Sequence, residues 1–134
     1  MLQINVSSHT PIYQQVIDQI KEQVLLGVLA PGDKLPSVRE LATTLTINPN
    51  TIQKAYQELE RQKVIVTVRG RGNYIAEQSE NKLNAEQLET LQEHFRKGII
   101  DALHLGMSPA EVKKLVERLI NELHSSGRNE NVKS

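Results

Sequence analysis

Two short amphipathic segments separated by a tight turn place the strongest constraint on the fold of this chain. Their apolar positions are Val38, Leu41, Ala42 and Leu45 in the first segment, and Ile52, Ala55, Tyr56 and Leu59 in the second. Both sets follow the i, i+3, i+4, i+7 spacing, so each segment is predicted to be a helix with one buried face. Two helices that cross steeply over a turn at residues 46–49 are typical of a helix-turn-helix unit.

The ends of both helices are indicated by capping residues. Ser37 and Glu40 form a capping-box pattern after Pro36, and Asn48 followed by Pro49 is a typical start for the second helix. This start places Asn50, Thr51, Gln53 and Lys54 on the first exposed turns. Amides bond an adenine edge in two places, and the first turns of a recognition helix face the base edges. We predict that these four residues contact DNA; the alternative is that they are ordinary solvated side chains.

A basic hairpin is predicted directly after the second helix. Residues 64–68 are rich in β-branched side chains, residues 69–72 read Arg-Gly-Arg-Gly, and residues 73–75 begin a return strand. Such a hairpin would be the wing of a winged helix-turn-helix. Arg69 and Arg71 would supply charge for phosphate or for a narrow minor groove. The alternative is a hairpin tip whose arginines only maintain solubility.

Charge is concentrated where these elements lie. The 134 residues include 16 basic and 16 acidic side chains, yet residues 34–72 carry seven basic against three acidic ones. A local positive patch of this kind is expected of a surface that binds phosphate. A chain of this length accommodates one domain and an appendage, but not two full domains.

Several functional classes are disfavoured by composition. The chain lacks cysteine, has no signal-peptide pattern and contains no apolar run that approaches the ~20 residues of a membrane span. Its four histidines are scattered singly, and no catalytic motif is present. We therefore expect a cytoplasmic protein that is not an enzyme, with no cofactor, no metal site and no membrane partner.

Flanking segments complete the predicted organisation. Leu2, Ile4 and Val6 indicate a short strand or a docked arm, and Thr10-Pro11 opens a helix that Gly27 ends. Residues 1–77 would then form the DNA-binding domain. After a polar linker, residues 83–125 are predicted to form two antiparallel helices, with a disordered tail at 126–134.

The two C-terminal helices carry wide apolar stripes that cannot cover each other completely. The stripes comprise Leu88, Leu91, Phe95, Ile99, Ala102 and Leu103 in one helix, and Val112, Leu115, Val116, Leu119, Ile120 and Leu123 in the other. We expect a second copy of the chain to cover the surplus in a homodimer. The alternative is packing within the same chain.

These motifs resemble those of the GntR family of bacterial transcription regulators. The matching stretches are PIY at residues 11–13, LAPGDKLPSVRELA at 29–42, INPNTIQKAYQELE at 47–60, and the two glycines Gly70 and Gly72. The short two-helix tail is similar to that of the YtrA-like subfamily, in which it serves dimerisation. The resemblance implies a dimeric regulator, usually a repressor, that binds an inverted-repeat operator on double-stranded DNA.

By position, the resemblance places DNA contacts at Ser37, Arg39, Asn50, Thr51, Gln53, Arg69 and Gly70, while Lys54 and Arg71 are added by the helix and wing patterns. Two departures occur: Gln62-Lys63 replaces the usual Glu-Gly after the recognition helix, and Asn73-Tyr74 replaces Thr-Phe in the wing.

The predicted fold is thus mainly α: a winged helix-turn-helix of three helices and a β-hairpin wing, followed by a two-helix antiparallel dimerisation element. A winged-helix adaptor that binds proteins instead of DNA is the competing hypothesis. The operator, the regulated genes and any small-molecule effector are not indicated by the sequence.

Overall fold

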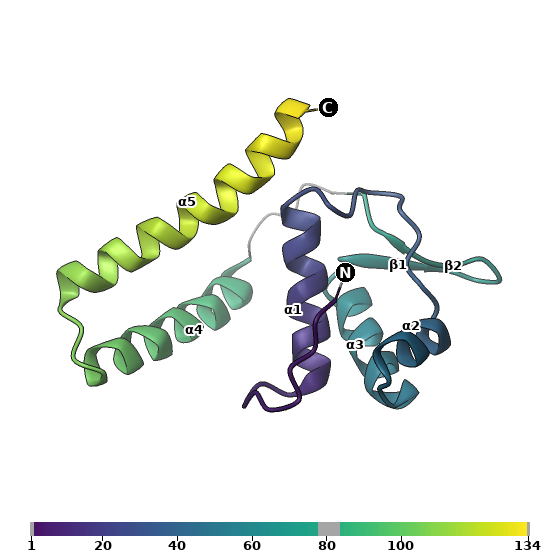
Figure 1. Ribbon diagram of the computed structural model, residues 1–134, viewed down its shortest axis with the longest axis horizontal. Helices are drawn as coiled ribbons and strands as arrows, with labels where there is room; N and C mark the ends of the chain where they lie inside the picture. Colours follow the sequence, from purple (N-terminus) through teal and green to yellow (C-terminus); the bar gives the residue numbers. More distant parts are fainter. Residues whose placement is uncertain (1, 78–83, 134) are drawn as a thin grey trace. The chain divides into compact units, whose positions relative to one another are not determined.

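The computed structural model describes residues 2–77 and 84–133, with side chains described as far as residue 124. Its elements are α1 (Ile12–Leu25), α2 (Val38–Leu45), α3 (Pro49–Arg61), β1 (Ile65–Val68), β2 (Gly72–Ile75), α4 (Ala85–His104) and α5 (Pro109–Lys133) (Figure 1). The predicted mainly helical fold with a hairpin after the third helix is confirmed. An N-terminal unit, here residues 2–77, and a C-terminal unit, here α4 and α5 as far as Asn129, are described separately.

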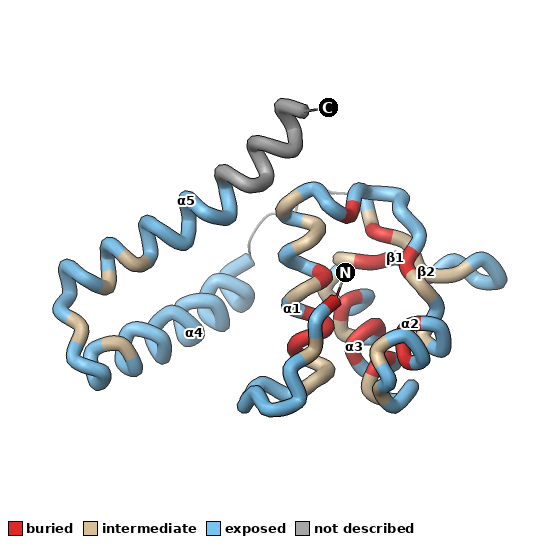
Figure 2. The backbone as a smooth tube through the Cα atoms, viewed as in Figure 1, coloured by how far each residue is buried: buried red, intermediate tan, exposed pale blue. Residues whose placement is uncertain are grey.

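The core of the N-terminal unit lies where α1, α2, α3 and the hairpin meet. Its buried side chains are Leu2, Val16, Ile17, Ile20, Leu29, Leu35, Leu41, Ala42, Ile52, Ala55, Tyr56, Leu59, Ile65 and Ile75. Figure 2 shows these buried stretches in red on all three helices and both strands. The apolar stripes predicted for α2 and α3 therefore face inward, and α1 completes a three-helix core as expected.

The N-terminal residues form a docked arm, whereas the strand alternative is wrong. Leu2 is buried, and two glutamines of α1 bind the arm's backbone. Asn5 N donates to Gln15 Oε1 at 2.9 Å, and Gln15 Nε2 donates to Asn5 O at 2.9 Å. Gln19 binds Gln3 in the same two-way manner. These side-chain amides take the place that a neighbouring strand would occupy.

Helix α1 starts differently from the prediction. Pro11 is the N-cap residue, and no side chain caps the helix, so Thr10 does not have the predicted role. The carbonyl oxygen of Thr10 instead accepts a hydrogen bond from Gln15 Nε2 at 2.9 Å. At the other end, Gly27 follows the helix with φ of 80°, as predicted for a C-terminal glycine.

The caps around the helix-turn-helix are largely as predicted. Ser37 Oγ accepts from Glu40 N at 3.0 Å, which is the first half of the predicted capping box. Asn48 Oδ1 accepts from Asn50 N at 2.8 Å, and Pro49 is the first residue of α3. Thr46 ends α2 in the left-handed region with φ of 56°. The direction of α3 is therefore set by local hydrogen bonds as well as by packing.

The wing is an antiparallel hairpin in which Val68 pairs with Gly72 and Ile65 pairs with Ile75. Both strands differ by one residue from the prediction, because β1 starts at Ile65 and β2 already starts at Gly72. Side-chain contacts stabilise it across the strands: Thr67 Oγ1 donates to Asn73 Oδ1 at 2.8 Å. Figure 1 shows the hairpin turn extending beyond the three helices.

The C-terminal unit consists of two helices that run in opposite directions and diverge from the turn at Gly106 (Figure 1). Each helix begins with a capping box, one between Asn84 and Gln87 and one between Ser108 and Glu111. Helix α5 continues to Lys133, through the range 126–133 for which the sequence predicted a disordered tail. A single glycine such as Gly127 costs a helix only about 1 kcal/mol, so it need not end one.

No residue of α4 is buried, and the same holds for α5 as far as residue 124. A Cβ at Gly98 would meet nothing within 4 Å, so this glycine does not mark a close approach of helices within the chain. Across the described residues, no helix has the length and apolar character needed to cross a bilayer.

Candidate nucleic-acid interface

Helix α3 separates its side chains into a buried and an exposed face. Ile52, Ala55, Tyr56 and Leu59 are buried, while Asn50, Gln53 and Lys54 are exposed and Thr51 is half-buried. Gln57 is also exposed, one turn after Gln53, and sequence reasoning missed it because it lies beyond the first turns. The exposed face is therefore polar over two helical turns, with three amide side chains that are able to bond base edges.

Tyr56 ties α3 to the start of α2. Its hydroxyl donates to Pro36 O at 2.7 Å. Burial, with a smaller contribution from the Glu40 carboxylate, raises the pKa of the Tyr56 phenol above its ordinary value, so the hydroxyl remains a donor. This bond fixes the crossing of the two helices next to Ser37, the predicted contact residue at the start of α2.

Ser37 and Arg39 are both exposed at the N-terminal turn of α2. The Ser37 oxygen accepts the capping bond, which leaves its hydroxyl hydrogen available to an external acceptor. Arg39 O accepts from Thr43 Oγ1 at 2.9 Å within the helix. A helix N-terminus with an exposed arginine favours a negatively charged partner such as phosphate.

Lys54 is positioned by an aromatic ring. Its ammonium nitrogen lies 3.8 Å from the centroid of the Tyr13 ring, which belongs to α1. Such cation–π contacts attract a lysine without neutralising its charge. Lys54 is thus directed toward the α1 side of α3, and the sequence pattern of α3 alone gave no sign of this.

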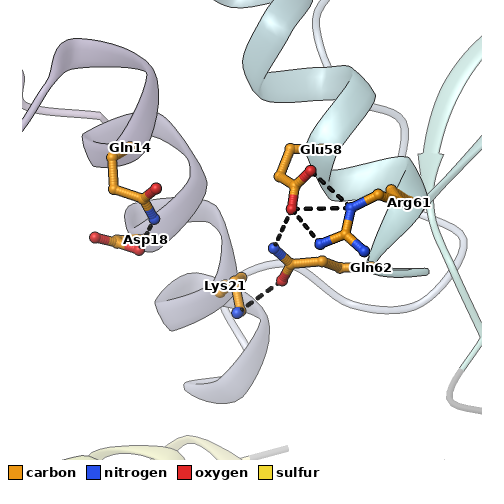
Figure 3. A network of polar contacts seen from close by, with 6 residues as sticks. All are labelled: Gln14, Asp18, Lys21, Glu58, Arg61 and Gln62. Carbon is orange, nitrogen blue, oxygen red and sulfur yellow. Dashed lines mark hydrogen bonds and ion pairs between the residues drawn. The ribbon is translucent and has the colours of Figure 1, made fainter. Parts of the chain in front are cut away.

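A polar network anchors the end of α3 (Figure 3). Glu58 accepts hydrogen bonds from Arg61 and from Gln62 Nε2, and Lys21 Nζ of α1 donates to Gln62 Oε1 at 2.9 Å. The bonds from Arg61, then from Gln62, lower the pKa of the Glu58 carboxyl to about 2. Gln62, a departure from the family pattern, therefore links α3 to α1.

The wing presents the second cluster of predicted contacts. Arg69, Gly70 and Arg71 are all exposed at the hairpin turn, with Arg71 N donating to Val68 O at 2.9 Å. Gly70 has φ of 80°, a conformation that a glycine adopts without strain, and the space around it is open. Residues 63–75 contain no acidic side chain, so the wing is uniformly positive.

In the described part of the chain, no group of three or more histidine, aspartate or glutamate side chains is arranged to hold a metal ion. The chemistry that the exposed residues offer is recognition through amides, hydroxyls and cations. Such groups suit a polyanion with hydrogen-bonding edges.

Comparison with known proteins identifies relatives of the chain. Residues 12–75 match the model of the bacterial regulatory proteins of the gntR family. The HTH-type transcriptional repressor YtrA of Bacillus subtilis is 43% identical over 130 residues, which cover 97% of this chain and 100% of the relative.

Two solved structures are also similar to this chain. A transcriptional antiterminator from Listeria monocytogenes EGD-e has a TM-score of 0.85 at 42% identity, covering 92% of each chain. The AraR DNA-binding domain in complex with operator ORX1 has a TM-score of 0.51 at 28% identity, covering 56% of this chain and 96% of that one.

Proposed function

Because this chain belongs to the gntR family of bacterial regulatory proteins, we propose that it acts as a homodimeric repressor on an operator of two inverted half-sites. The chain is a DNA-binding transcriptional regulator and not an enzyme. The competing hypothesis, a protein-binding adaptor without DNA binding, is not favoured, because the relatives of this chain are regulators of transcription. We further propose that it works in the cytoplasm, where the operator would be.

The observation that carries the proposal is the exposed face of α3. Asn50 and Gln53 present amides on the first turns, and the buried side of the same helix is fixed by Ile52 and Tyr56. A rigid scaffold with two free amides is suited to reading base edges. Thr51, half-buried beside them, would add a hydroxyl and a methyl group.

Cationic residues would hold the DNA backbone. Arg39 at the start of α2, Lys54 on α3, and Arg69 and Arg71 in the wing would bind phosphates, and Ser37 and Gly70 would allow close approach of the backbone. Contacts to phosphate fix the position of a protein on the duplex but do not read its sequence. The residues that would read the base sequence are therefore different from the residues that would position the protein on the duplex.

Dimerisation is assigned to α4 and α5. Their exposed apolar side chains include Leu88, Leu91, Phe95, Ile99, Leu103, Val116, Leu119, Ile120 and Leu123. Continuous apolar surface of this extent on a helix pair is typical of an interface between chains. A twofold-symmetric dimer would present two α3 helices to two inverted half-sites.

Binding measurements on single-residue variants test the DNA contacts. Duplexes selected from a random pool by the full-length protein would serve as the operator probe. Gln53→Ala and Thr51→Ala should each weaken specific binding by roughly 1–3 kcal/mol and relax the sequence preference. Asn121→Ala, which removes an exposed amide on the polar side of α5, is the matched control and should bind like wild type.

Arginine substitutions give a different result on the same duplexes. Arg69→Ala and Arg71→Ala should weaken selected and random duplexes alike, and each should reduce the slope of log affinity against log salt by about 1 for each subunit, or about 2 for the homodimer. If Gln53→Ala and Thr51→Ala both keep the wild-type affinity and preference, α3 is not the recognition helix.

A further inference from the structure

The wing sheet is extended by residues 32–35, which pair with β2. Gly32 N donates to Ile75 O at 2.9 Å, Ile75 N donates to Asp33 O at 2.8 Å, and Leu35 N donates to Asn73 O at 2.8 Å. Lys34 lies opposite Tyr74 in an antiparallel bridge. The backbone at Lys34 is therefore fixed to β2 by hydrogen bonds on both sides of it.

Alternation along the strands separates the two faces of this sheet. Leu35, Ile65 and Ile75 are buried on the face toward the core, which places Lys34 and its partner Tyr74 on the outer face. Lys34 is exposed there.

The side chain of Lys34 passes over Gly72, where the outer face has no side chain. A Cβ built at Gly72 would lie 3.1 Å from Lys34 Cε and 3.8 Å from its Nζ. The missing side chain thus leaves room for the lysine stem. The ammonium group consequently lies next to the first residue of β2, immediately after the turn that contains Arg69 and Arg71.

Within the described residues Lys34 has no ion pair, and β1, the turn and β2 carry no acidic residue. The neighbouring Asp33 forms no ion pair with Lys34, and its Oδ2 accepts from Ala30 N at 2.9 Å. Cations concentrated at one end of a hairpin repel one another, and the binding of an anion relieves that repulsion.

We propose that Lys34 binds a backbone phosphate of DNA beside the wing, held in place by residues 32–35 and by the open space over Gly72. The inference rests on the proposed function and adds a phosphate contact that lies in neither the helix-turn-helix nor the hairpin turn. An ammonium on a flexible stem binds phosphate as a point charge. Its contribution is independent of base sequence.

Lys34→Met tests the contact, because methionine keeps an apolar stem over Gly72 and removes only the charge. Full-length protein would be titrated by fluorescence anisotropy, over a range of salt, against a selected duplex and a random-sequence duplex. For each subunit, Lys34→Met should weaken binding to both duplexes about five- to tenfold at ~0.1 M salt and reduce the salt slope by about 0.9, so a homodimer should show both effects twice over. Lys34→Arg should restore both quantities.

Lys114→Met is the matched control, because Lys114 is exposed on the polar side of α5 and its loss changes the net charge equally. It should leave the salt slope at the wild-type value. An unchanged slope for Lys34→Met, a loss that Lys34→Arg does not restore, or a loss that accompanies a lower melting temperature would each overturn the proposal.

The same titrations distinguish this failure from a failure of the proposed function. If Gln53→Ala lowers the preference for the selected duplex while Lys34→Met has no effect, only the Lys34 contact is wrong. If the wild-type protein binds selected and random duplexes equally, the operator function itself is wrong.

Discussion

The N-terminal and C-terminal units carry similar apolar stripes but use them in different ways. In the N-terminal unit Val16, Ile52 and Leu59 are fully buried. In the C-terminal unit Phe95 is 58% exposed and Ile120 is 56% exposed. Periodicity identifies a helix face that needs covering, but it does not say what covers it. The first unit buries its stripes within itself, whereas the stripes of the second stay exposed and, on the proposed function, would pack against a second copy of the chain.

Leucine-to-alanine substitutions in the two units should sharpen this contrast most strongly. Leu59→Ala should lower the free energy of unfolding of the N-terminal unit by about 2–5 kcal/mol, since it removes a fully buried side chain and leaves a cavity. Thermal and denaturant unfolding of the full-length protein would measure the loss.

Leu119→Ala is the counterpart in α5, where the side chain is 46% exposed. It should leave the unfolding of the N-terminal unit unchanged and weaken self-association, as measured by sedimentation. Equal losses of N-terminal stability in the two variants would break the distinction between the units.

A smaller effect on the free energy of unfolding is expected at Lys63, just after α3 in the N-terminal unit. Lys63 has φ of 63°, in the left-handed region where a side chain is strained. Lys63→Gly should raise the free energy of unfolding by about 1 kcal/mol. The matched control is Lys114→Gly in the interior of α5, which should destabilise its helix. A destabilised Lys63→Gly variant would show that the lysine makes a compensating contact.

The smallest effect concerns the Glu58 network. Hydrogen bonds from Arg61 and Gln62 hold the pKa of the Glu58 carboxyl at about 2, below its usual value. A depressed pKa means that the stabilisation is present above the unfolded-state pKa of about 4.3 and is lost as pH falls toward 2. Glu58→Gln should therefore show a shallower loss of stability than wild type between these values, with little difference below them. Acid titrations followed by circular dichroism would compare the two proteins.

Much of the fold was predictable because it is encoded locally. Ser37 and Asn48 define helix starts through hydrogen bonds within three residues, and Pro49 is the first residue of α3. The stripes of α2 and α3 follow from spacing alone. The arm was less predictable. Its docking depends on Gln15 and Gln19 reaching backbone groups far along the chain.

The candidate site likewise contains residues that local patterns predict and residues whose placement depends on distant contacts. The exposed positions Asn50, Gln53 and Arg69 follow from helix and hairpin periods. The placement of Lys54 over Tyr13, the link from Lys21 to Gln62, and the position of Lys34 beside Gly72 depend on tertiary packing. A single sequence gives no measure of such contacts, because they join segments with unrelated periodicity.

Removal of the C-terminal unit tests the central claim most directly. A protein that ends at Ser79 keeps the whole core of the N-terminal unit, so it should fold cooperatively, and sedimentation should show a monomer. Because two linked half-site contacts gain from effective concentration, its affinity for the selected full operator should fall on the order of 100-fold or more. Binding to a single half-site should match that of the full-length protein. A truncated protein that remains dimeric, or that binds the full operator as tightly as the intact chain, would contradict the assignment of dimerisation to α4 and α5.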